Sequence, residues 1–584
     1  MTAAPVHHNG RATRVGVGLV RADLRRYLLG AAIWAAWWAA PALIGLLLQA
    51  AFDAVTGDAA AGLTFPTAIA LLVAVEAGRL GVFFSAFLVW ARWWARMQAL
   101  LRTNLLRAQL ASGGEGAGRP VQGAGASIAV FRDDVQDVIE YVDGWVDLTG
   151  TLGFATVALV VMARVDLALT LVVALPLVAV FVVTRVLAER LRRVRLADRQ
   201  ATARVTGLLG DLFSAVLAVK VAGAEDRAVR RLRELNAARL RTSLRDKVLE
   251  QVLEAFNSST VDVTIGLVLL LVAGQMRAGE FTVGDLALFT SYLSWLAGLP
   301  RWAGLVLTRH RHAQVAVRRM ARLLPGDDET QAVRPRPLHL DRPYTPPTLP
   351  RAATPAPPAI TLRGFGVRHP GGGGVHGVDL DLPAGSFTVV RGPVGAGKST
   401  LLRGLLGLAG EVEGTVTWDG EPVTDLAAHF VPPRAAYVPQ VPRLFSATLR
   451  DNLLLGRQTS DGVLAAALRA AAFDADVAEM PDGVATVVGP RGVRLSGGQL
   501  QRAAAARALA ADAAFLVLDD LSSALDAATE QQLWQRLLDA REGAHRPTVL
   551  VVSHRAGALE HADQVVEVHD GVVTVHPVGV PDPA

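Results

Sequence analysis

The stretch Gly392-Pro-Val-Gly-Ala-Gly-Lys-Ser399 matches the pattern G-x-x-x-x-G-K-[ST]. The apolar, β-branched run before it, Ser386–Arg391, predicts a strand, and the run that begins at Thr400 predicts a helix. In this strand–loop–helix setting, glycines allow backbone N–H groups to turn toward phosphate oxygens, and the helix N-terminus adds positive potential. The stretch therefore predicts a nucleotide phosphate-binding loop in an α/β domain.

The residues of this loop have distinct expected roles. The predicted nucleotide-binding set is Gly392, Gly395, Gly397, Lys398, Ser399 and Thr400. Lys398 is expected to reach the β- and γ-phosphates, and the Ser399 hydroxyl is expected to bind Mg²⁺. Further along, the apolar run Phe515–Asp519 predicts a buried strand that delivers Asp519 to the same ion.

The composition indicates a membrane protein. Of the 584 residues, 51% are hydrophobic and only 19% are charged, and the mean hydropathy is +0.34. These values are unusual for a soluble protein. The net charge of +5 is small for this length, and no basic stripe with interleaved aromatics is present, so nucleic-acid binding is not predicted. The absence of cysteine excludes disulfides, thiolate catalysis and cysteine-ligated zinc.

Apolar runs before residue 310 predict six membrane spans. They cover about residues 27–52, 66–90, 146–162, 167–187, 261–273 and 286–307. Arginines concentrate in the segments after the second, fourth and sixth spans and before the first, which places these segments in the cytoplasm. Two inner stretches, about 92–140 and 188–255, are long enough to extend beyond the bilayer as helices.

These patterns divide the chain into four parts. They are a cytoplasmic tail at 1–26, a membrane domain at 27–324, a proline-rich linker at 325–358 and a nucleotide-binding domain at 359–584. The recurrent prolines predict an extended, semi-rigid connection. We expect an integral, multi-pass protein of the plasma membrane (the inner membrane of a bacterium), with its N-terminus and nucleotide-binding domain in the cytoplasm.

Two charges lie inside the second predicted span. Glu76 and Arg79 are three residues apart and share one helical face, so they predict either a structural ion pair or groups that line a membrane pathway. The tryptophans of the membrane domain predict interfacial anchors or packing more than a binding cage. They are Trp34, Trp37, Trp38, Trp90, Trp93, Trp94, Trp295 and Trp302.

The motif Leu495-Ser-Gly-Gly-Gln499 precedes a further predicted helix. With this motif, the phosphate loop and the six spans, the chain resembles an ATP-binding cassette half-transporter of the exporter type, over almost its whole length. The resemblance implies an all-α six-helix transmembrane domain fused to one α/β P-loop ATPase domain, with ATP and Mg²⁺ as cofactors. It also implies a dimer that holds two ATP molecules between two nucleotide-binding domains.

Several residue roles are implied by the resemblance. The signature loop, which acts on the ATP of the opposite subunit, is Leu495, Ser496, Gly497, Gly498 and Gln499. The D-loop is Ser523, Ala524, Leu525 and Asp526. Gln440, in Tyr437-Val-Pro-Gln440, is implied to contact Mg²⁺, and His554 to contact the γ-phosphate. The inner tips near 112–118 and 208–218 are implied to be coupling helices, and Lys220 matches the pattern just after the second tip.

Three positions depart from the family pattern. Asp520 stands where a glutamate usually polarises the attacking water, and its shorter side chain withdraws the carboxylate from that water. A misplaced general base costs about 10²–10⁴ in rate, although a small backbone shift would restore the contact. His369 stands where an aromatic residue stacks on adenine, and Pro490 stands where many exporters carry a glutamate.

In this family, an aspartate at the position of Asp520 often marks one half of a heterodimer with one weak ATP site. We therefore expect ATP-driven transport, in the export direction, by one half of a heterodimer with a second half-transporter. The alternatives are an active homodimer, an importer with the exporter fold such as a siderophore importer, and a regulatory subunit that only binds nucleotide. Lipid, peptide, drug and siderophore all remain open as cargo.

Overall fold

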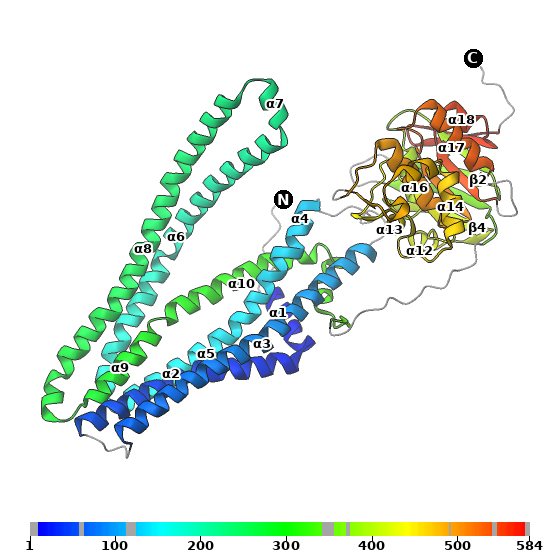
Figure 1. Cartoon of the computed structure of the whole chain (residues 1–584). Helices are drawn as coiled ribbons and strands as arrows, with labels where there is room; N and C mark the ends of the chain where they lie inside the picture. Colours follow the sequence, from blue (N-terminus) through cyan, green and yellow to red (C-terminus); the bar gives the residue numbers. More distant parts are fainter. Residues whose placement is uncertain are drawn as a thin grey trace. The chain divides into compact units, whose positions relative to one another are not determined.

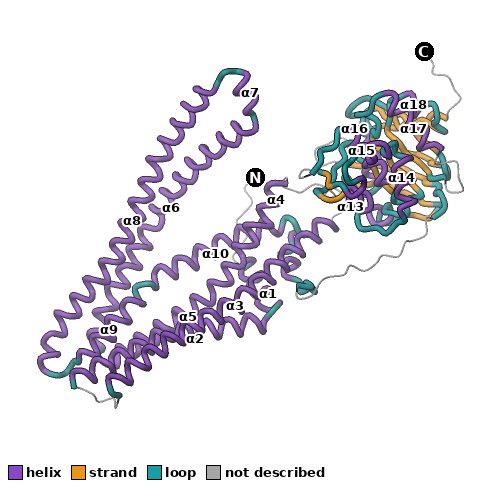
Figure 2. The backbone as a smooth tube through the Cα atoms, viewed as in Figure 1, coloured by secondary structure: helices purple, strands orange, loops and turns teal. Residues whose placement is uncertain are grey.

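The computed structural model describes residues 10–57, 63–111, 124–340, 355–368, 374–489, 492–539 and 546–577. The chain folds as two compact units. One comprises residues 1–105 with 128–338, and the other comprises residues 106–127 with 339–584. In Figures 1 and 2 the first unit is helical, whereas the second holds all the strands. Each unit is described by itself below.

The helical part of the chain consists of long helices joined by short turns. Its elements are α1 (Arg11–Ala22), α2 (Leu24–Thr56), α3 (Phe65–Ala111), α4 (Ala124–Ala129), the π-helical turn η2 (Val130–Asp134), α5 (Val135–Val165), α6 (Leu167–Ser214), α7 (Val216–Val221), α8 (Glu225–Ala278), α9 (Val283–Leu296) and α10 (Leu299–Ala321). The 54 residues of α8 measure about 80 Å, far more than a bilayer needs. The predicted helical extensions are therefore confirmed.

Each predicted span lies within these helices, but the six are not alike. Among the described residues, four helices are long and apolar enough to cross a membrane: Leu24–Thr56, Phe65–Ala111, Ser127–Val165 and Glu225–Ala278. The fourth predicted span lies in α6, whose described apolar stretch is only Leu167–Pro176. The sixth is divided between α9 and α10, because the chain leaves the helix at residues 297 and 298 before Leu299-Pro300 starts the next one.

Side-chain caps fix the helix ends that the sequence placed on the outer side. Asp166 accepts a hydrogen bond from the Leu169 N–H at the start of α6 and another from Gln275 of α8. At the start of α9, Thr282 and Asp285 form a capping box, and Gln49 of α2 donates to Asp285. These bonds satisfy helix-end groups and tie neighbouring helices together.

The start of the predicted linker is not extended. Residues Pro325–Asp327 and Glu329–Val333 form short 3₁₀ turns, η3 and η4, and η4 packs on α1 and α10. The buried Glu329 carboxylate pairs with Arg14 at 2.9 Å and Arg11 at 3.6 Å. The buried Asn104 amide donates to the carbonyls of Ala332 and Arg334. The recurrent prolines predicted an extended segment, but these buried polar contacts hold its first residues on the helical unit.

The second unit contains two main sheets. Its elements are β1 (Ile360–Arg368), β2 (Gly374–Leu382), β3 (Phe387–Arg391), α11 (Lys398–Leu405), β4 (Glu411–Trp418), β5 (Glu421–Pro422), α12 (Leu426–His429), β6 (Ala435–Val438), β7 (Ala447–Thr448), α13 (Leu449–Leu454), α14 (Asp461–Ala470), α15 (Asp474–Glu479), η5 (Gly483–Ala485), β8 (Val487–Val488), α16 (Gly497–Leu509), β9 (Phe515–Asp519), α17 (Ala527–Asp539), β10 (Thr548–Val552), α18 (Ala556–Leu559), β11 (Gln564–His569) and β12 (Val572–Pro577). The larger sheet has the order β12-β11-β3-β10-β9-β6. Its five strands from β11 to β6 run parallel to one another. The other sheet, β2-β1-β4-β5, is antiparallel.

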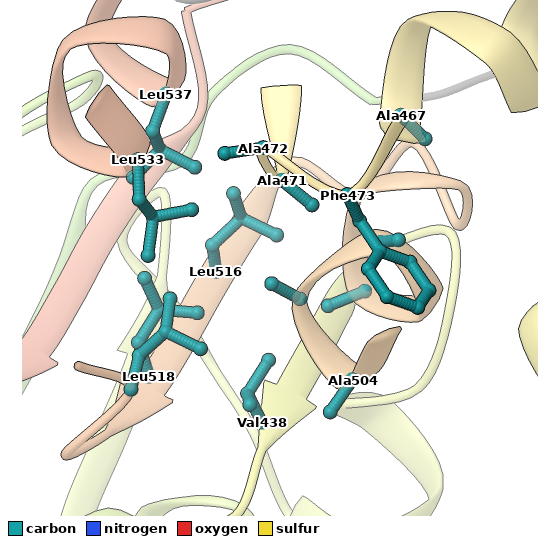
Figure 3. Packing of buried hydrophobic residues seen from close by; sticks show 14 of the residues in the cluster. Val438, Ala467, Ala471, Ala472, Phe473, Ala504, Leu516, Leu518, Leu533 and Leu537 are labelled. Carbon is teal, nitrogen blue, oxygen red and sulfur yellow. The ribbon is translucent and has the colours of Figure 1, made fainter. Parts of the chain in front are cut away.

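Strand β9 shows why the central strands are apolar throughout. Leu516 and Leu518 point to a core covered by α14, α16 and α17, as Figure 3 shows, whereas Phe515 and Val517 point to a core closed by α11 and the antiparallel sheet. Successive side chains of a strand point to opposite faces, so a strand buried on both faces reads as a continuous apolar run. The α/β domain and the strand predicted before Asp519 are confirmed.

One buried amide organises the loop before α13. Asn452 is fully buried, accepts a hydrogen bond from the Phe445 N–H, and donates to the carbonyls of Phe445, Ala447 and Thr448. Asn452→Ala removes this partner from the Phe445 N–H and the Ala447 carbonyl, at a cost of about 1–3 kcal/mol for each buried group that stays unsatisfied, whereas the Phe445 carbonyl keeps a hydrogen bond from the Ala447 N–H. We therefore expect the thermal unfolding midpoint of this domain to fall by several degrees, as measured by calorimetry of the purified chain.

Asp461→Ala provides the matched control. Asp461 forms an exposed ion pair with Arg450 in the same domain, and such pairs contribute about 0–1 kcal/mol. An Asn452→Ala midpoint equal to that of Asp461→Ala would contradict the prediction.

Candidate functional site

The predicted site residues gather where the parallel strands end. Strands β3, β10, β9 and β6 are consecutive neighbours in register, so their carboxyl ends lie along one edge of the sheet. The phosphate loop follows β3, His554 follows β10, Asp519 and Asp520 end β9, and Gln440 follows β6. In open parallel sheets, ligands bind at this edge. Residues up to 160 positions apart in the chain are thereby brought together.

The phosphate loop has the backbone that its glycines predict. Gly392, Gly395 and Gly397 have φ values of +147°, +88° and +104°, which other residues rarely adopt. A Cβ atom at Gly392 would also collide with the Val568 carbonyl of β11. The Lys398 ammonium lies inside the turn, 2.7 Å from the carbonyls of both Gly392 and Pro393. Helix α11 begins at this lysine, so its free N–H groups face the loop.

Two of the three predicted Mg²⁺ ligands, Ser399 and Asp519, meet at the sheet edge. The Ser399 hydroxyl donates to Asp519 Oδ1 at 3.0 Å, and Asp519 is only 1% exposed. A hydroxyl and a carboxylate form the oxygen donor set that Mg²⁺ prefers, so these residues fit the ion. Burial raises the pKa of the Asp519 carboxyl, whereas the hydrogen bonds from Ser399 and Tyr437 lower it.

Behind Asp519 lies a pair that the sequence analysis did not single out. The Tyr437 hydroxyl donates to Asp519 Oδ2 at 3.2 Å, and Arg403 Nε donates to the Tyr437 oxygen at 3.3 Å. Burial raises the pKa of Tyr437 to about 12, so its hydroxyl keeps the proton that it donates. Tyr437 stands in β6 opposite Val517 of β9, which places both on the same face as Asp519. This contact can be predicted only once the pairing of β6 with β9 is known, because no spacing in the sequence indicates it.

Asp520 has an unusual backbone. Its φ is +53°, in the left-handed region that glycine, asparagine and aspartate adopt more readily than other residues, and its N–H donates to the Val552 carbonyl of β10. The Gln440 amide donates to Asp520 Oδ2 at 3.4 Å. The other oxygen, Oδ1, is buried without a hydrogen-bond partner among the described residues. The carboxylate is thus held beside the Gln440 side chain at the mouth of the site.

His554 is exposed, immediately beyond the buried end of β10. The next residue, Arg555, anchors this loop. Its guanidinium pairs with Glu530 of α17 at 3.0 Å, and its backbone N–H donates to the Ser553 hydroxyl. The buried Glu530 also accepts from Ser522, beside the D-loop. The two loops are therefore fixed to the same helix, which leaves the imidazole free to meet a ligand.

The signature motif forms the N-terminus of α16. Ser496 and Gln499 make a reciprocal capping box, so the motif folds as a pre-formed helix start. The Gln499 side chain also donates to Asp476 of α15, which pairs with Arg502 at 3.0 Å. Gly497 and Gly498 lie against Ala524, where their lack of side chains permits close approach.

Gln501 joins the signature helix to the D-loop. This side chain is 5% exposed, donates to the Ser523 hydroxyl at 2.8 Å, and accepts from the Ala524 N–H at 3.0 Å. Leu525 is buried, whereas Asp526 accepts from Thr529 and starts α17. Gln501 was not predicted from the sequence. Its position two residues after the motif, on the inner face of a predicted helix, could have indicated a buried contact.

Two predicted positions, His369 and Pro490, lie outside the described residues. Thr400 is the third residue of α11. The first predicted inner tip, 112–118, also lies outside the described residues. The second predicted tip, 208–218, comprises the end of α6 and the start of α7. Apolar side chains at this turn are exposed: Phe213, Leu217 and Val221 are each more than three-quarters exposed within the chain. Lys220 pairs with Glu225 across the turn that follows.

In the helical unit, Arg79 lies between two tryptophan rings. Its guanidinium carbon is 4.7 Å from the Trp37 ring centroid and 4.8 Å from that of Trp295. Glu76 is 3.5 Å away, and its side chain is 50% exposed, whereas the Arg79 side chain is 14% exposed. Arg79 thus connects α3 to α2 and α9, while its partner carboxylate stays accessible.

The tryptophans near Arg79 form one aromatic cluster at the middle of the predicted spans. Trp37 contacts Trp34, Trp38, Phe83 and Trp295, and Trp38 contacts Trp302. Packing, one of the two roles that the sequence indicated, describes these rings. Interfacial anchoring stays a prediction.

The sequence matches two protein families. Residues 29–299 match "ABC transporter transmembrane region", and residues 375–523 match "ABC transporter". Relatives include an ATP-dependent lipid A-core flippase of Chromobacterium violaceum, 28% identical over 77% of this chain and 74% of that protein. The mycobactin import ATP-binding/permease protein IrtB of Mycolicibacterium thermoresistibile is 41% identical, but the match spans only 34% of each chain.

Among solved structures, a bacterial Atm1-family ABC exporter with ATP bound has the same fold. The TM-score is 0.67 at 23% sequence identity, and the match covers 95% of both chains. Both halves of the architecture, the helical membrane domain and the α/β nucleotide-binding domain, are therefore accounted for by one family. The chain belongs to the ATP-binding cassette transporters, as an exporter-type half-transporter.

Proposed function

We propose that this chain is one half of a dimeric transporter that binds ATP and Mg²⁺ and moves a substrate across the membrane by alternating access. The observation that carries the proposal is the gathering of the phosphate loop, Asp519, Asp520, Gln440 and His554 at one sheet edge, beside a pre-formed signature helix. The difference in ATP-binding energy between the open and closed dimers would drive the change of state.

In the proposed site, each residue acts on the nucleotide in a distinct way. The phosphate-loop amides and Lys398 bind the phosphates, and His554 contacts the γ-phosphate. Ser399 and Asp519 would hold Mg²⁺, which would supply positive charge beside the phosphate oxygens. The signature loop serves the ATP bound by the partner subunit, and Gln501 ties that loop to the D-loop.

The ATP site formed by this chain's own phosphate loop is proposed to hydrolyse slowly. Asp520 is one methylene shorter than glutamate, and the carboxylate faces the Gln440 amide. Because the αL backbone is already fixed by the bond to Val552, a compensating shift would have to break that bond. A general base withdrawn from its water loses much of its effect.

An attenuated site and an intact signature loop favour a heterodimer. This chain would complete the active site of a second half-transporter that carries the glutamate, while its own site binds ATP and turns it over slowly. An active homodimer is the competing arrangement, since Lys398, Gln440, Asp519 and His554 are all in place.

Export is the proposed direction, supported by the exporter fold. Import is a second candidate, because the relative with 41% identity bears the name of a mycobactin import protein. The apolar tip at α7, with its exposed Phe213, Leu217 and Val221, is proposed as a coupling element that is covered in the assembled transporter.

We further propose that Glu76 lines the substrate pathway and that Arg79 is structural. A carboxylate facing lipid at the centre of a span costs at least about 2.5 kcal/mol, so an exposed one faces water or another chain. Arg79 is already enclosed by two rings, and each cation–π contact contributes about 0.5–2 kcal/mol.

The first prediction concerns the chain alone in lipid nanodiscs. We expect ATP binding but an ATPase rate close to that of Lys398→Ala, since every ATP site that copies of this chain can form carries Asp520 in place of the usual glutamate. Binding is measured with a fluorescent ATP analogue and hydrolysis by phosphate release. A robust rate that Lys398→Ala abolishes would establish an active homodimer instead. Absence of ATP binding would remove the proposed function altogether.

The second prediction is that Asp520→Glu raises the ATPase rate of the chain alone by about 10-fold or more, because the longer side chain returns the carboxylate to the attacking water. Asp520→Asn, which preserves the length but removes the base, serves as the control and should stay at background. Equal rates for the Glu and Asn variants would show that Asp520 does not limit hydrolysis.

The third prediction uses the absence of cysteine. Glu76→Cys should react with a water-soluble, membrane-impermeant thiol reagent in nanodiscs at least about 10-fold faster than Leu71→Cys. Leu71 is also exposed on α3, but it lies about 140° around the helix. Since the chain has no other thiol, each rate reports one position. Equal, slow labelling of both variants would place Glu76 away from any aqueous pathway.

A further inference from the structure

The hydrogen bonds behind Asp519 have a defined direction. An arginine side chain is only a donor, so Arg403 Nε must give its hydrogen to the Tyr437 oxygen. The single hydroxyl hydrogen of Tyr437 is then directed to Asp519 Oδ2, 3.2 Å away. Asp519 Oδ1 receives the Ser399 hydroxyl at 3.0 Å. Each carboxylate oxygen thus has one assigned donor, from a different element.

Packing alone does not explain the tyrosine. The ring of Tyr437 packs against the core between α11 and the sheets, a role that phenylalanine would fill equally well. The hydroxyl extends past that core to the carboxylate, and Arg403 reaches the hydroxyl from the last turn of α11, the helix that begins with Lys398 and Ser399. The same helix therefore contacts Asp519 from two sides, directly through Ser399 and indirectly through Arg403 and Tyr437.

We propose that Tyr437 is a positioning residue for the Mg²⁺ site. It holds Asp519 Oδ2 away from the ion so that Oδ1 is presented beside Ser399, and Arg403 acts through Tyr437 by orienting its hydroxyl. This inference rests on the proposed binding of Mg²⁺ and ATP, and it adds a second layer of residues to that site. Such outer partners typically change metal affinity about 10–100-fold when they are removed.

The test is Tyr437→Phe, which removes one oxygen and keeps the ring. Mn²⁺ replaces Mg²⁺, and its ATP-dependent binding to the full chain is followed by electron paramagnetic resonance. We expect the apparent Mn²⁺ affinity to fall about 10-fold or more, because Asp519 loses the bond that fixes its orientation. Binding of ATP in the presence of a chelator should stay unchanged, since the phosphate loop is intact. Unchanged Mn²⁺ affinity would overturn the inference.

Arg403→Met tests the order of action. If Arg403 acts through Tyr437, it weakens Mn²⁺ binding in the otherwise native chain but adds nothing in the Tyr437→Phe background. Equal, additive losses in both backgrounds would show that Arg403 acts on Asp519 by its charge alone, and would overturn its assigned role. Arg450→Met removes an exposed arginine from the same domain and should leave Mn²⁺ affinity unchanged.

These measurements separate the two levels of the proposal. A wild-type chain that binds neither ATP nor Mn²⁺–ATP would contradict the proposed function. A wild-type chain that binds both, with a Tyr437→Phe variant of equal affinity, would contradict only the positioning role. A melting curve of each variant reports whether the domain is folded, and a loss of chelator-resistant ATP binding by Tyr437→Phe would also count against a role confined to the ion.

Discussion

The parallel pairing of β3, β10, β9 and β6 is the constraint on which the nucleotide site depends. These strands are mostly apolar and buried on both faces, so the polar side chains of the site emerge where the strands end, apart from Tyr437 within β6. Every group with expected chemistry then meets at one edge: the loop amides and Lys398, the carboxylates of β9, Gln440 and His554. At this edge, the hydrogen bond between Ser399 and Asp519 joins the start of α11 to the end of β9.

The helical unit depends on other interactions, since the hydrophobic effect contributes little to the association of helices in lipid. Its helices are joined instead by polar and aromatic contacts at particular places. At one end Asp166, Asp285 and Gln49 connect helix termini. At mid-span Arg79 lies between rings from α2 and α9. At the other end Glu329 and Asn104 fasten the segment that leads out of the unit.

Local patterns in the sequence were sufficient for the fold class, the phosphate loop, the β9 strand and the helical extensions, because each depends on periodicity or backbone conformation that neighbouring residues determine. Contacts that depend on strand order were not accessible in that way. Tyr437 reaches Asp519 only because β6 lies beside β9, and 82 residues separate the two in the chain. The start of the linker was misjudged for a similar reason, since its anchors Arg14 and Asn104 lie far upstream.

The signature helix with the D-loop and the residue Asp520 differ in how the surrounding hydrogen bonds hold them. The signature helix and D-loop, which are proposed to serve the partner's ATP, are joined by Gln501, and Ser496 caps the helix. Asp520, which is proposed to serve the chain's own ATP, has a left-handed backbone with one carboxylate oxygen unsatisfied among the described residues. A pre-formed signature helix and a short carboxylate side chain at position 520 both support the proposed heterodimer, in which this chain would complete the ATP site of a second half-transporter.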